Sequence, residues 1–372
     1  MGRVGGVFAI ISLKCGYVVD VILIAIDQLV IRQLVIRQFV IVPKRVYTEN
    51  IMGSLSEGIS SQDRFGHSPS HWYKTTIMIL ETVAILVLLS TLTVWSYQQS
   101  IHILVWVSMC IQGCWMQRVY CVGHESSHRK LLPNHHVLNN IIGQIFLWIL
   151  LVPLSVFRKI HDFHHSANRR DVHTSALDVY VIPSDANLLQ RALPHLFWYL
   201  GIFCGGWFIH SLVSIVLFLL LPVRIARRVS PAFHGWTFQD QIISWGCFLV
   251  PIAIHVCLVQ WVGFALWSRC YLIPFAVFAM VYSLQLYIYH YRTTIGPKTL
   301  YHARKLTGPK WISWWLLHLN EHDTHHQQPK VVWYALPECH KPLPQEFEGN
   351  QNVQTFFQGV LQQCNGPTLV KK

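Results

Sequence analysis

Charged residues are scarce in this chain of 372 residues. Asp, Glu, Lys and Arg together make up 12% of it, about half of the roughly 25% that soluble domains carry. Apolar and aromatic residues account for 52%, and the mean hydropathy is +0.36. The shortage of charge excludes an ordinary soluble or disordered protein and predicts a membrane protein that crosses the bilayer several times.

Cysteine pairs of the metal-binding kind are also missing. No Cys-x-x-Cys occurs, and most of the ten cysteines lie inside apolar runs. This pattern predicts buried, reduced thiols, and it excludes both a disulfide framework and a thiolate metal site.

Acidic residues are the scarcer charged type, 17 against 29 basic residues, so the net charge is +12. In a membrane protein such an excess marks cytoplasmic loops, and no nucleic-acid-binding motif occurs. We therefore expect contacts with membrane lipid and none with nucleic acid. The basic clusters, all predicted to be cytosolic, are Arg129-Lys130, Arg158-Lys159, Arg169-Arg170, Arg224 to Arg228, and 292–310.

The N-terminal segment, residues 1–51, differs from the rest of the chain. An apolar stretch over 4–26 is followed by a short repeat over 28–42. A signal anchor, an organelle-targeting extension and sequence upstream of a true start at Met52 are the three interpretations that stay open. We expect a polar segment over 52–71, the functional domain over 72–340 and a polar C-terminal tail over 341–372.

Six apolar runs lie within the predicted functional domain. A helix needs about 17–25 apolar residues to cross a bilayer, and four runs that qualify form two hairpins, 75–96 with 101–122 and 242–261 with 271–290. The runs 141–157 and 196–221 are predicted to be re-entrant or interfacial, because only then do all basic clusters share one side. We therefore expect an all-α integral membrane protein with four transmembrane helices and a cytosolic, histidine-rich cap. A full crossing by 196–221 and a fifth span near the N-terminus are the alternatives.

Histidine, in contrast, is abundant: 22 residues, more than all acidic residues together. Three clusters follow predicted cytosolic ends of apolar runs. On a helix, residues at i, i+3 and i+4 share a face, so each cluster presents two or three imidazoles together and predicts metal binding. These histidine boxes are His124-Glu-Ser-Ser-His128 (first), His161-Asp-Phe-His164-His165 (second) and His322-Asp-Thr-His325-His326 (third).

The metal can be argued from the number and type of ligands. Eight imidazoles exceed the four ligands of one zinc ion, and a structural zinc site would favour thiolates. Imidazole suits iron, copper, nickel and zinc. Two iron ions with about four ligands each, leaving positions open for O2, use this set best.

Other residues near the boxes are weaker candidates. His290, at the end of the last apolar run, is a possible ninth ligand. The carboxylates Glu125, Asp162, Glu321 and Asp323 flank box histidines and are candidate partners of the ring N–H groups, with ordinary surface polarity as the alternative. Histidines near the boxes but off their spacing are predicted not to bind metal; they are His135, His136, His173 and His318.

The three boxes, in this order around two hairpins, resemble the membrane fatty acid desaturase family over roughly 72–340. The resemblance implies a di-iron, O2-dependent oxidoreductase whose eight box histidines bind iron on the cytosolic face. The spacing of the first box is more like acyl-lipid desaturases than acyl-CoA desaturases. The matching motifs are Gly123-His-Glu-Ser-Ser-His128, Asn139-Asn-Ile-Ile-Gly143, Tyr271-Leu-Ile-Pro274, Asn320-Glu-His-Asp-Thr-His-His326 and Val332-Trp-Tyr-Ala-Leu-Pro337.

The chain departs from the family pattern in two places. Acyl-CoA desaturases have an additional histidine ligand that His290 resembles, but Leu286 stands where they have an asparagine that holds a water ligand. The His-Pro-Gly-Gly heme motif of a fused cytochrome b5 is missing, so the resemblance implies a separate electron donor, cytochrome b5 or ferredoxin.

The reaction implied by the resemblance places a cis double bond in a fatty acyl lipid or acyl thioester, using O2 and two electrons. A hydroxylase or ketolase of the same superfamily, acting on alkanes, sphingoid bases or carotenoids, is the enzymatic alternative. A non-catalytic metal-binding membrane protein is the other. The endoplasmic reticulum is the expected location in a eukaryote, and plastid or bacterial inner membranes stay open.

Overall fold

The computed structural model of this chain describes residues 69–171, 181–208 and 216–370. The predictions for the N-terminal segment 1–51, and for nearly all of 52–71, concern residues outside these ranges. His173 also lies outside them.

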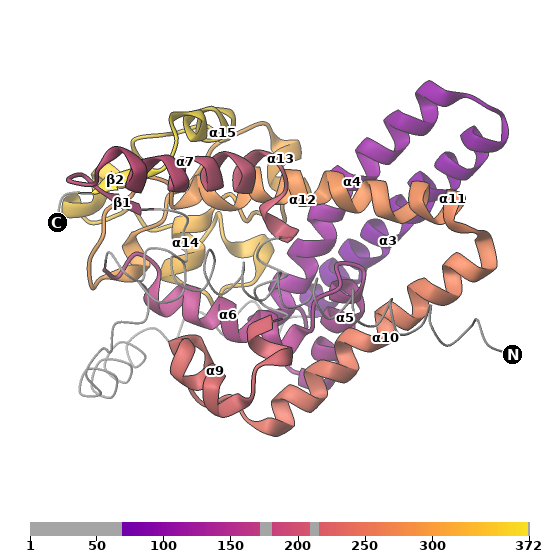
Figure 1. The fold of residues 1–372 in the computed structure, drawn as a ribbon, viewed down its shortest axis with the longest axis horizontal. Coiled ribbons are helices and arrows are strands. Elements are labelled where there is room, and N and C mark those ends of the chain that lie inside the picture. Colours follow the sequence, from indigo (N-terminus) through magenta and orange to yellow (C-terminus); the bar gives the residue numbers. More distant parts are fainter. Residues whose placement is uncertain (1–68, 172–180, 209–215, 371–372) are drawn as a thin grey trace, which may run out of the picture. The chain divides into compact units, whose positions relative to one another are not determined.

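The first predicted hairpin consists of α3 (Pro69–Gln98) and α4 (His102–Ser127). A tight turn joins them, and Ser100 in that turn adopts a left-handed φ of 57°. The two helices lie side by side in Figure 1. The predicted helical hairpin over 75–122 is therefore confirmed.

The second hairpin begins with α10 (Phe238–Val262). Its first turn has a capping box, in which Thr237 and Asp240 bond each other's backbone N–H groups. Gly263, with φ 81°, ends the helix in a conformation that costs glycine little. The returning arm is α11 (Phe264–Trp267), the π-helical turn η5 (Ser268–Leu272), α12 (Ile273–Leu286) and the 3₁₀ turn η6 (Tyr287–Tyr289).

Three helices among the described residues are long and apolar enough to cross a membrane: Ser70–Gln98, Phe238–Val262 and Phe264–Tyr289. The helix α4, which we predicted to be the fourth, is long enough but too polar. Its buried polar side chains bond neighbouring helices instead; the Gln112 amide donates to the Cys270 carbonyl at 2.7 Å. The four-span topology therefore stays a prediction. The structure has three apolar helices that are candidate spans, and two of them, α3 and α12, pack against the more polar α4.

The two runs predicted not to cross are divided into shorter helices. Residues 141–157 fall in α5 (His136–Trp148) and α6 (Leu154–Ala167), separated at Pro153. The 13 residues of α5 extend about 20 Å, less than the roughly 30 Å of a bilayer core. The second run begins in α7 (Leu188–Phe203) and ends in η3 (Val216–Leu220), with 209–215 outside the described residues.

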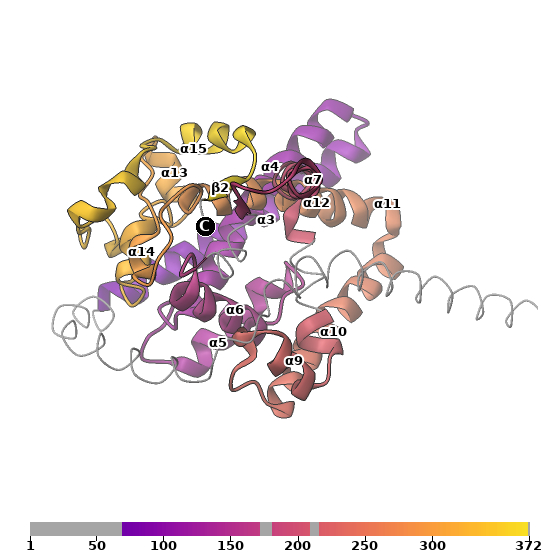
Figure 2. The same cartoon turned by 60° about the vertical axis from the view of Figure 1, so that its left-hand side comes forward.

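The remaining elements are short. A small parallel sheet joins β1 (Val181–Pro183) to β2 (Thr368–Val370), and the C-terminal elements gather together in Figure 2. The predicted tail 341–372 contributes Val353 and Phe356 to the main core. The other elements are α9 (Val223–Val229), η4 (Pro231–Phe233), η7 (Thr299–Tyr301), α13 (Lys310–Trp315), α14 (His322–Gln327), η8 (Trp333–Ala335), η9 (Gln345–Gln351), α15 (Phe356–Gln362) and η10 (Gln363–Asn365).

The cysteines within the described ranges are all free, as predicted, but the expected burial was wrong for most of them. Only Cys121 among them is buried, whereas Cys110, Cys204, Cys257 and Cys364 are exposed. Cys110 on α4 and Cys257 on α10, for example, lie on helix faces that point away from the protein core.

The close approach of α4 and α12 gives the first testable prediction. A Cβ added to Gly113 would come within 2.6 Å of the Pro274 carbonyl oxygen and 2.5 Å of the Val277 Cβ. Gly113→Ala should force the helices apart and lower the unfolding free energy by about 1–3 kcal/mol, measured as a lower Tm in detergent. Gly246→Ala on α10 is the control, because its Cβ would meet nothing within 4 Å; equal Tm values for the two variants would contradict the prediction.

Candidate metal centre

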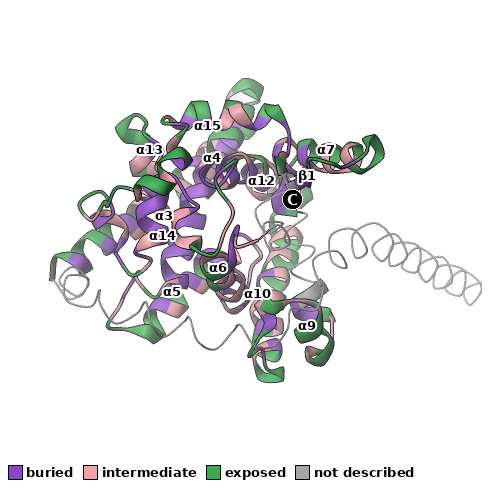
Figure 3. Ribbon diagram, turned by 90° about the vertical axis from the view of Figure 1, so that its left-hand side faces the viewer, coloured by how far each residue is buried: buried purple, intermediate pink, exposed green. Residues whose placement is uncertain are grey.

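Three helices carry the histidine boxes. The first box lies in the last turn of α4, and His128 is the residue that ends it. The second box lies on α6 and the third on the short helix α14, whose first five residues, His322–His326, are all buried (Figure 3). The helical spacing expected from the sequence is present: the Nε2 atoms of His161 and His165, at i and i+4, are 3.1 Å apart.

Four histidines from three boxes form the first imidazole group, which contains His124, His128, His161 and His325. One ring nitrogen from each lies within 4.8 Å of the others. The Nε2 atoms of His128 and His161 are 2.8 Å apart. The group thus joins α4, α6 and α14.

A second imidazole group lies beside the first and contains His164, His290, His322 and His326. The Nε2 atoms of His290 and His322 are 3.0 Å apart, and those of His164 and His326 are 3.2 Å apart. His165 lies between the groups, because its Nε2 is close to His161 and its ring stacks on His326 at 4.3 Å between centroids. The candidate ninth ligand, His290, is therefore brought to the same place as the eight box histidines.

The arrangement of these ring nitrogens suits binding to a shared metal ion better than hydrogen bonding between the rings. Two imidazole nitrogens bound at right angles to one metal, with bonds of about 2.0–2.1 Å, would lie about 2.9 Å apart. Buried ring nitrogens are also left without a hydrogen-bond partner, including Nε2 of His124 and His325. Unpaired buried polar atoms are costly, and a metal ion would satisfy them. Each group could hold one ion.

Burial also keeps these imidazoles in the form that binds metal. Desolvation lowers the pKa of His161, His322 and His325 well below the usual value, and it lowers that of His164 to about 4. The neighbouring imidazoles add to the shift, because each would repel a second positive charge. At neutral pH these four rings are neutral and their lone pairs are available.

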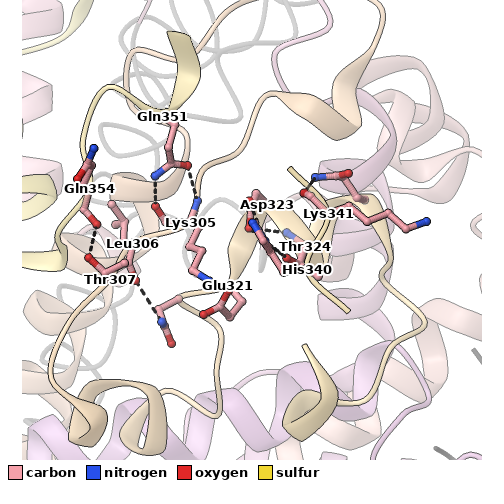
Figure 4. Close-up of polar contacts among 12 residues, drawn as sticks. Lys305, Leu306, Thr307, Glu321, Asp323, Thr324, His340, Lys341, Gln351 and Gln354 are labelled. Carbon is pink, nitrogen blue, oxygen red and sulfur yellow. Dashed lines mark hydrogen bonds and ion pairs between the residues drawn. The ribbon is translucent and has the colours of Figure 1, made fainter. Parts of the chain in front are cut away.

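Of the carboxylates that flank the boxes, Glu321 and Asp323 have partners other than the box imidazoles, whereas Glu125 lies beside one of them. Glu125 Oε1 is 3.6 Å from His124 Nδ1, too far for a hydrogen bond. Glu321 pairs with the Lys305 ammonium at 2.7 Å, and Asp323 accepts from the Thr324 backbone N–H at 2.6 Å (Figure 4).

The carboxylates near the third box also form a possible third metal group, since ligand atoms of Glu321, Asp323 and His340 lie within 4.8 Å of one another. Lys305 already supplies a cation there. Asp162 on α6 interacts with Arg158 and Lys159, and burial raises its pKa. The proposed role of the four carboxylates as partners of ligand rings stays a prediction.

A backbone carbonyl holds His290 in its place. The Nδ1 atom of His290 is 2.8 Å from the His302 carbonyl oxygen and 2.9 Å from the Asn168 amide. Donation from Nδ1 to that carbonyl leaves Nε2 free to bind metal. Sequence reasoning missed the His302 carbonyl, because a backbone carbonyl leaves no signature in a sequence.

The histidines predicted not to bind metal have other contacts. His318 stacks near Trp333, with ring centroids 6.3 Å apart, and His135 packs against Trp72 at 4.9 Å. His136 is the first residue of α5. None of these three belongs to either imidazole group.

The known proteins to which this chain is similar are named as desaturases. The chain is 23% identical over 279 residues to an sn-1 oleoyl-lipid 12-desaturase of Synechocystis, covering 70% of this chain and 73% of that protein. It is 24% identical over 259 residues to a chloroplastic omega-6 fatty acid desaturase of Glycine max, covering 65% of this chain and 56% of the relative. A similar Arabidopsis thaliana protein matches at 22% identity over 81% of this chain and 67% of its own length.

A family model described as fatty acid desaturase matches residues 101–357, well over half of the chain and including all three histidine boxes. Together with the two imidazole groups, this match assigns the class of the protein. The chain belongs to the fatty acid desaturase family, a family of oxidoreductases.

Proposed function

We propose that this protein is a membrane-bound di-iron desaturase that places a cis double bond in a fatty acyl chain, using O2 and two electrons from a separate donor. The observation that carries the proposal is the pair of adjacent, buried groups of four imidazoles. The catalytic domain is proposed to lie within 72–340, although the family match continues to residue 357.

The ligand assignment follows the two groups. One iron would be held by His124, His128, His161 and His325, and the other by His164, His290, His322 and His326. His165, between the groups, completes the set of nine. When bound, two irons would supply the activation of O2 that removing hydrogen from an unactivated C–H bond requires.

Aromatic side chains form an apolar wall beside the imidazoles. Phe157 stacks on His161 at 5.4 Å between centroids, and Tyr120 lies 6.1 Å from His124. Trp207 and Tyr282 continue this wall, 4.5 Å apart. These rings are buried in the main hydrophobic core, so they exclude water from this side of the imidazoles, as oxidation of an unactivated C–H bond would require.

Two observations support an acyl group linked to a lipid rather than to coenzyme A. The first box has three residues between its histidines, as in acyl-lipid desaturases, and the Synechocystis relative is named for an oleoyl-lipid. The chloroplastic relatives favour a plastid or bacterial membrane, where ferredoxin would be the donor, over the endoplasmic reticulum with cytochrome b5. The boxes are proposed to face the cytosol or its equivalent in these compartments.

Lipid analysis of a host that expresses the protein tests this function. New cis-unsaturated fatty acid methyl esters are the expected result, and they should be absent when His325 and His326 are both replaced by alanine. Oxygenated lipids instead would identify a hydroxylase or ketolase. Bound iron with no change in the host lipids would favour the non-catalytic, metal-binding alternative.

A further inference from the structure

A buried arginine lies on α4, the helix that carries the first histidine box, and precedes that box in the chain. Arg118 of α4 is 1% exposed and precedes His124 by less than two turns. Its Nε donates to the Thr82 hydroxyl at 3.1 Å, and one terminal nitrogen pairs with the Glu81 carboxylate; both partners lie on α3. The other terminal nitrogen donates to the Trp314 backbone carbonyl, in the last turn of α13.

The tryptophans of α13 strengthen this contact from the other side. The Trp314 indole N–H donates to Glu81 Oε1 at 3.0 Å, and the Trp315 indole N–H donates to the Cys114 carbonyl at 2.9 Å. The guanidinium also lies 4.8 Å from the Trp314 ring centroid, a distance at which a cation is attracted to the ring. The α3–α4 hairpin thus holds the C-terminal end of α13 through side chains of both helices.

The chain is strained immediately after this contact. Leu317 and His318 have φ values of 50° and 56°, and a left-handed conformation costs a non-glycine residue roughly 1–2 kcal/mol. Two such residues in succession persist only where the surroundings hold them. This turn redirects the chain from α13 into α14, where His322 follows within four residues.

We propose that Arg118, together with Glu81, is a positioning residue for the metal centre. It caps the α13 carbonyl, holds the strained turn at Leu317–His318 and thereby places the third histidine box. The proposal rests on the proposed function only in taking that box to bind metal.

The geometry requires a guanidinium. Carbonyls at a helix C-terminus lack their usual helical partners, and a cation there is favourable. The Trp314 carbonyl also accepts from the Leu317 N–H, at a long 3.4 Å. The three acceptors of Arg118 lie on three different residues, so a planar group with five N–H donors can reach them together and a lysine ammonium cannot.

The test measures two properties of the full-length protein purified in detergent. These are the iron bound per chain and the rate of amide hydrogen exchange over 316–327 in metal-free protein. Arg118→Gln should lower iron from two per chain to about one, because α14 supplies two ligands of the second imidazole group and one of the first. Exchange over 316–327 should become at least tenfold faster, and Arg118→Lys should give intermediate values.

Two further variants separate capping of α13 from charge neutralisation and from a general loss of packing. The double variant Arg118→Gln/Glu81→Gln removes both charges. If it restores iron and exchange to wild-type values, Arg118 only neutralises Glu81 and the proposal is overturned.

Gln112→Leu, which removes another buried polar contact of α4, should keep two irons and the slow exchange of the wild type over 316–327. Equal losses in Gln112→Leu, or none in Arg118→Gln, would also overturn it.

The two measurements separate this proposal from the proposed function. A wild-type protein that binds no iron contradicts the proposed function, while the exchange rates of the metal-free protein still report on the turn. A wild-type protein that binds two irons, with normal exchange in Arg118→Gln, contradicts only the positioning role.

Discussion

Replacing His325 with alanine should remove iron from the first imidazole group and lower product formation by more than about a hundredfold. Residues that only orient metal ligands already cost 10–100-fold when replaced, and His325 is proposed to be a ligand itself. Its ring lies 4.7 Å from His124, 4.8 Å from His128 and 4.7 Å from His165 between centroids. Metal analysis of the purified protein and fatty acid methyl esters from the host are the two measurements.

The matched control is His318→Asn in the same segment. His318 lies outside both imidazole groups, and asparagine tolerates the left-handed φ of 56° that this position requires. This variant should keep its iron and its product. If His325→Ala retained two irons per chain, the assignment of His325 as a ligand would be wrong.

Replacing His290 with alanine should leave about one iron per chain and abolish the product. The second imidazole group would lose one of its four nitrogens, whereas the first would keep all of its own. A reaction that needs both irons would then stop although half of the metal remains. Iron content, measured beside product formation, separates this outcome from a general loss of folding, in which both irons would be lost.

The control for His290 is His302→Gln. The His302 backbone carbonyl, which accepts from His290 Nδ1, is kept, while a second buried imidazole close in the sequence is removed. Two irons and wild-type product are expected from this control. Two irons in His290→Ala would show that His290 has a structural role only and that the centre uses box histidines alone.

The grouping of the histidines illustrates what local sequence pattern can and cannot predict. Spacing at i, i+3 and i+4 places the members of one box on one helix face. It does not predict that His161 and His164, from the same box, belong to different imidazole groups, or that His325 is separated from His322 and His326. That division depends on how α4, α6 and α14 cross, and no residue pattern within a box records the crossing.

The prediction that α4 is an apolar transmembrane span was incomplete, because sequence alone did not show what surrounds this helix. Residues 101–122 are apolar on average, which predicts a span, but hydropathy does not distinguish a helix facing lipid from one enclosed by other helices. Gln117 and Arg118 are fully or almost fully buried and are bonded to side chains of α12 and α3. Polar residues in such a helix are tolerated because neighbouring helices satisfy them.

The sequence by itself determined the membrane class, the two helical hairpins and the eight box histidines as candidate ligands, because charge content and helical periodicity are local properties of the chain. Tertiary structure alone decided the division into two imidazole groups, the place of His290 and the partners of Arg118. The contact from Arg118 to Trp314 joins residues 196 positions apart. Such contacts follow from the packing of distant helices, which sequence spacing does not encode.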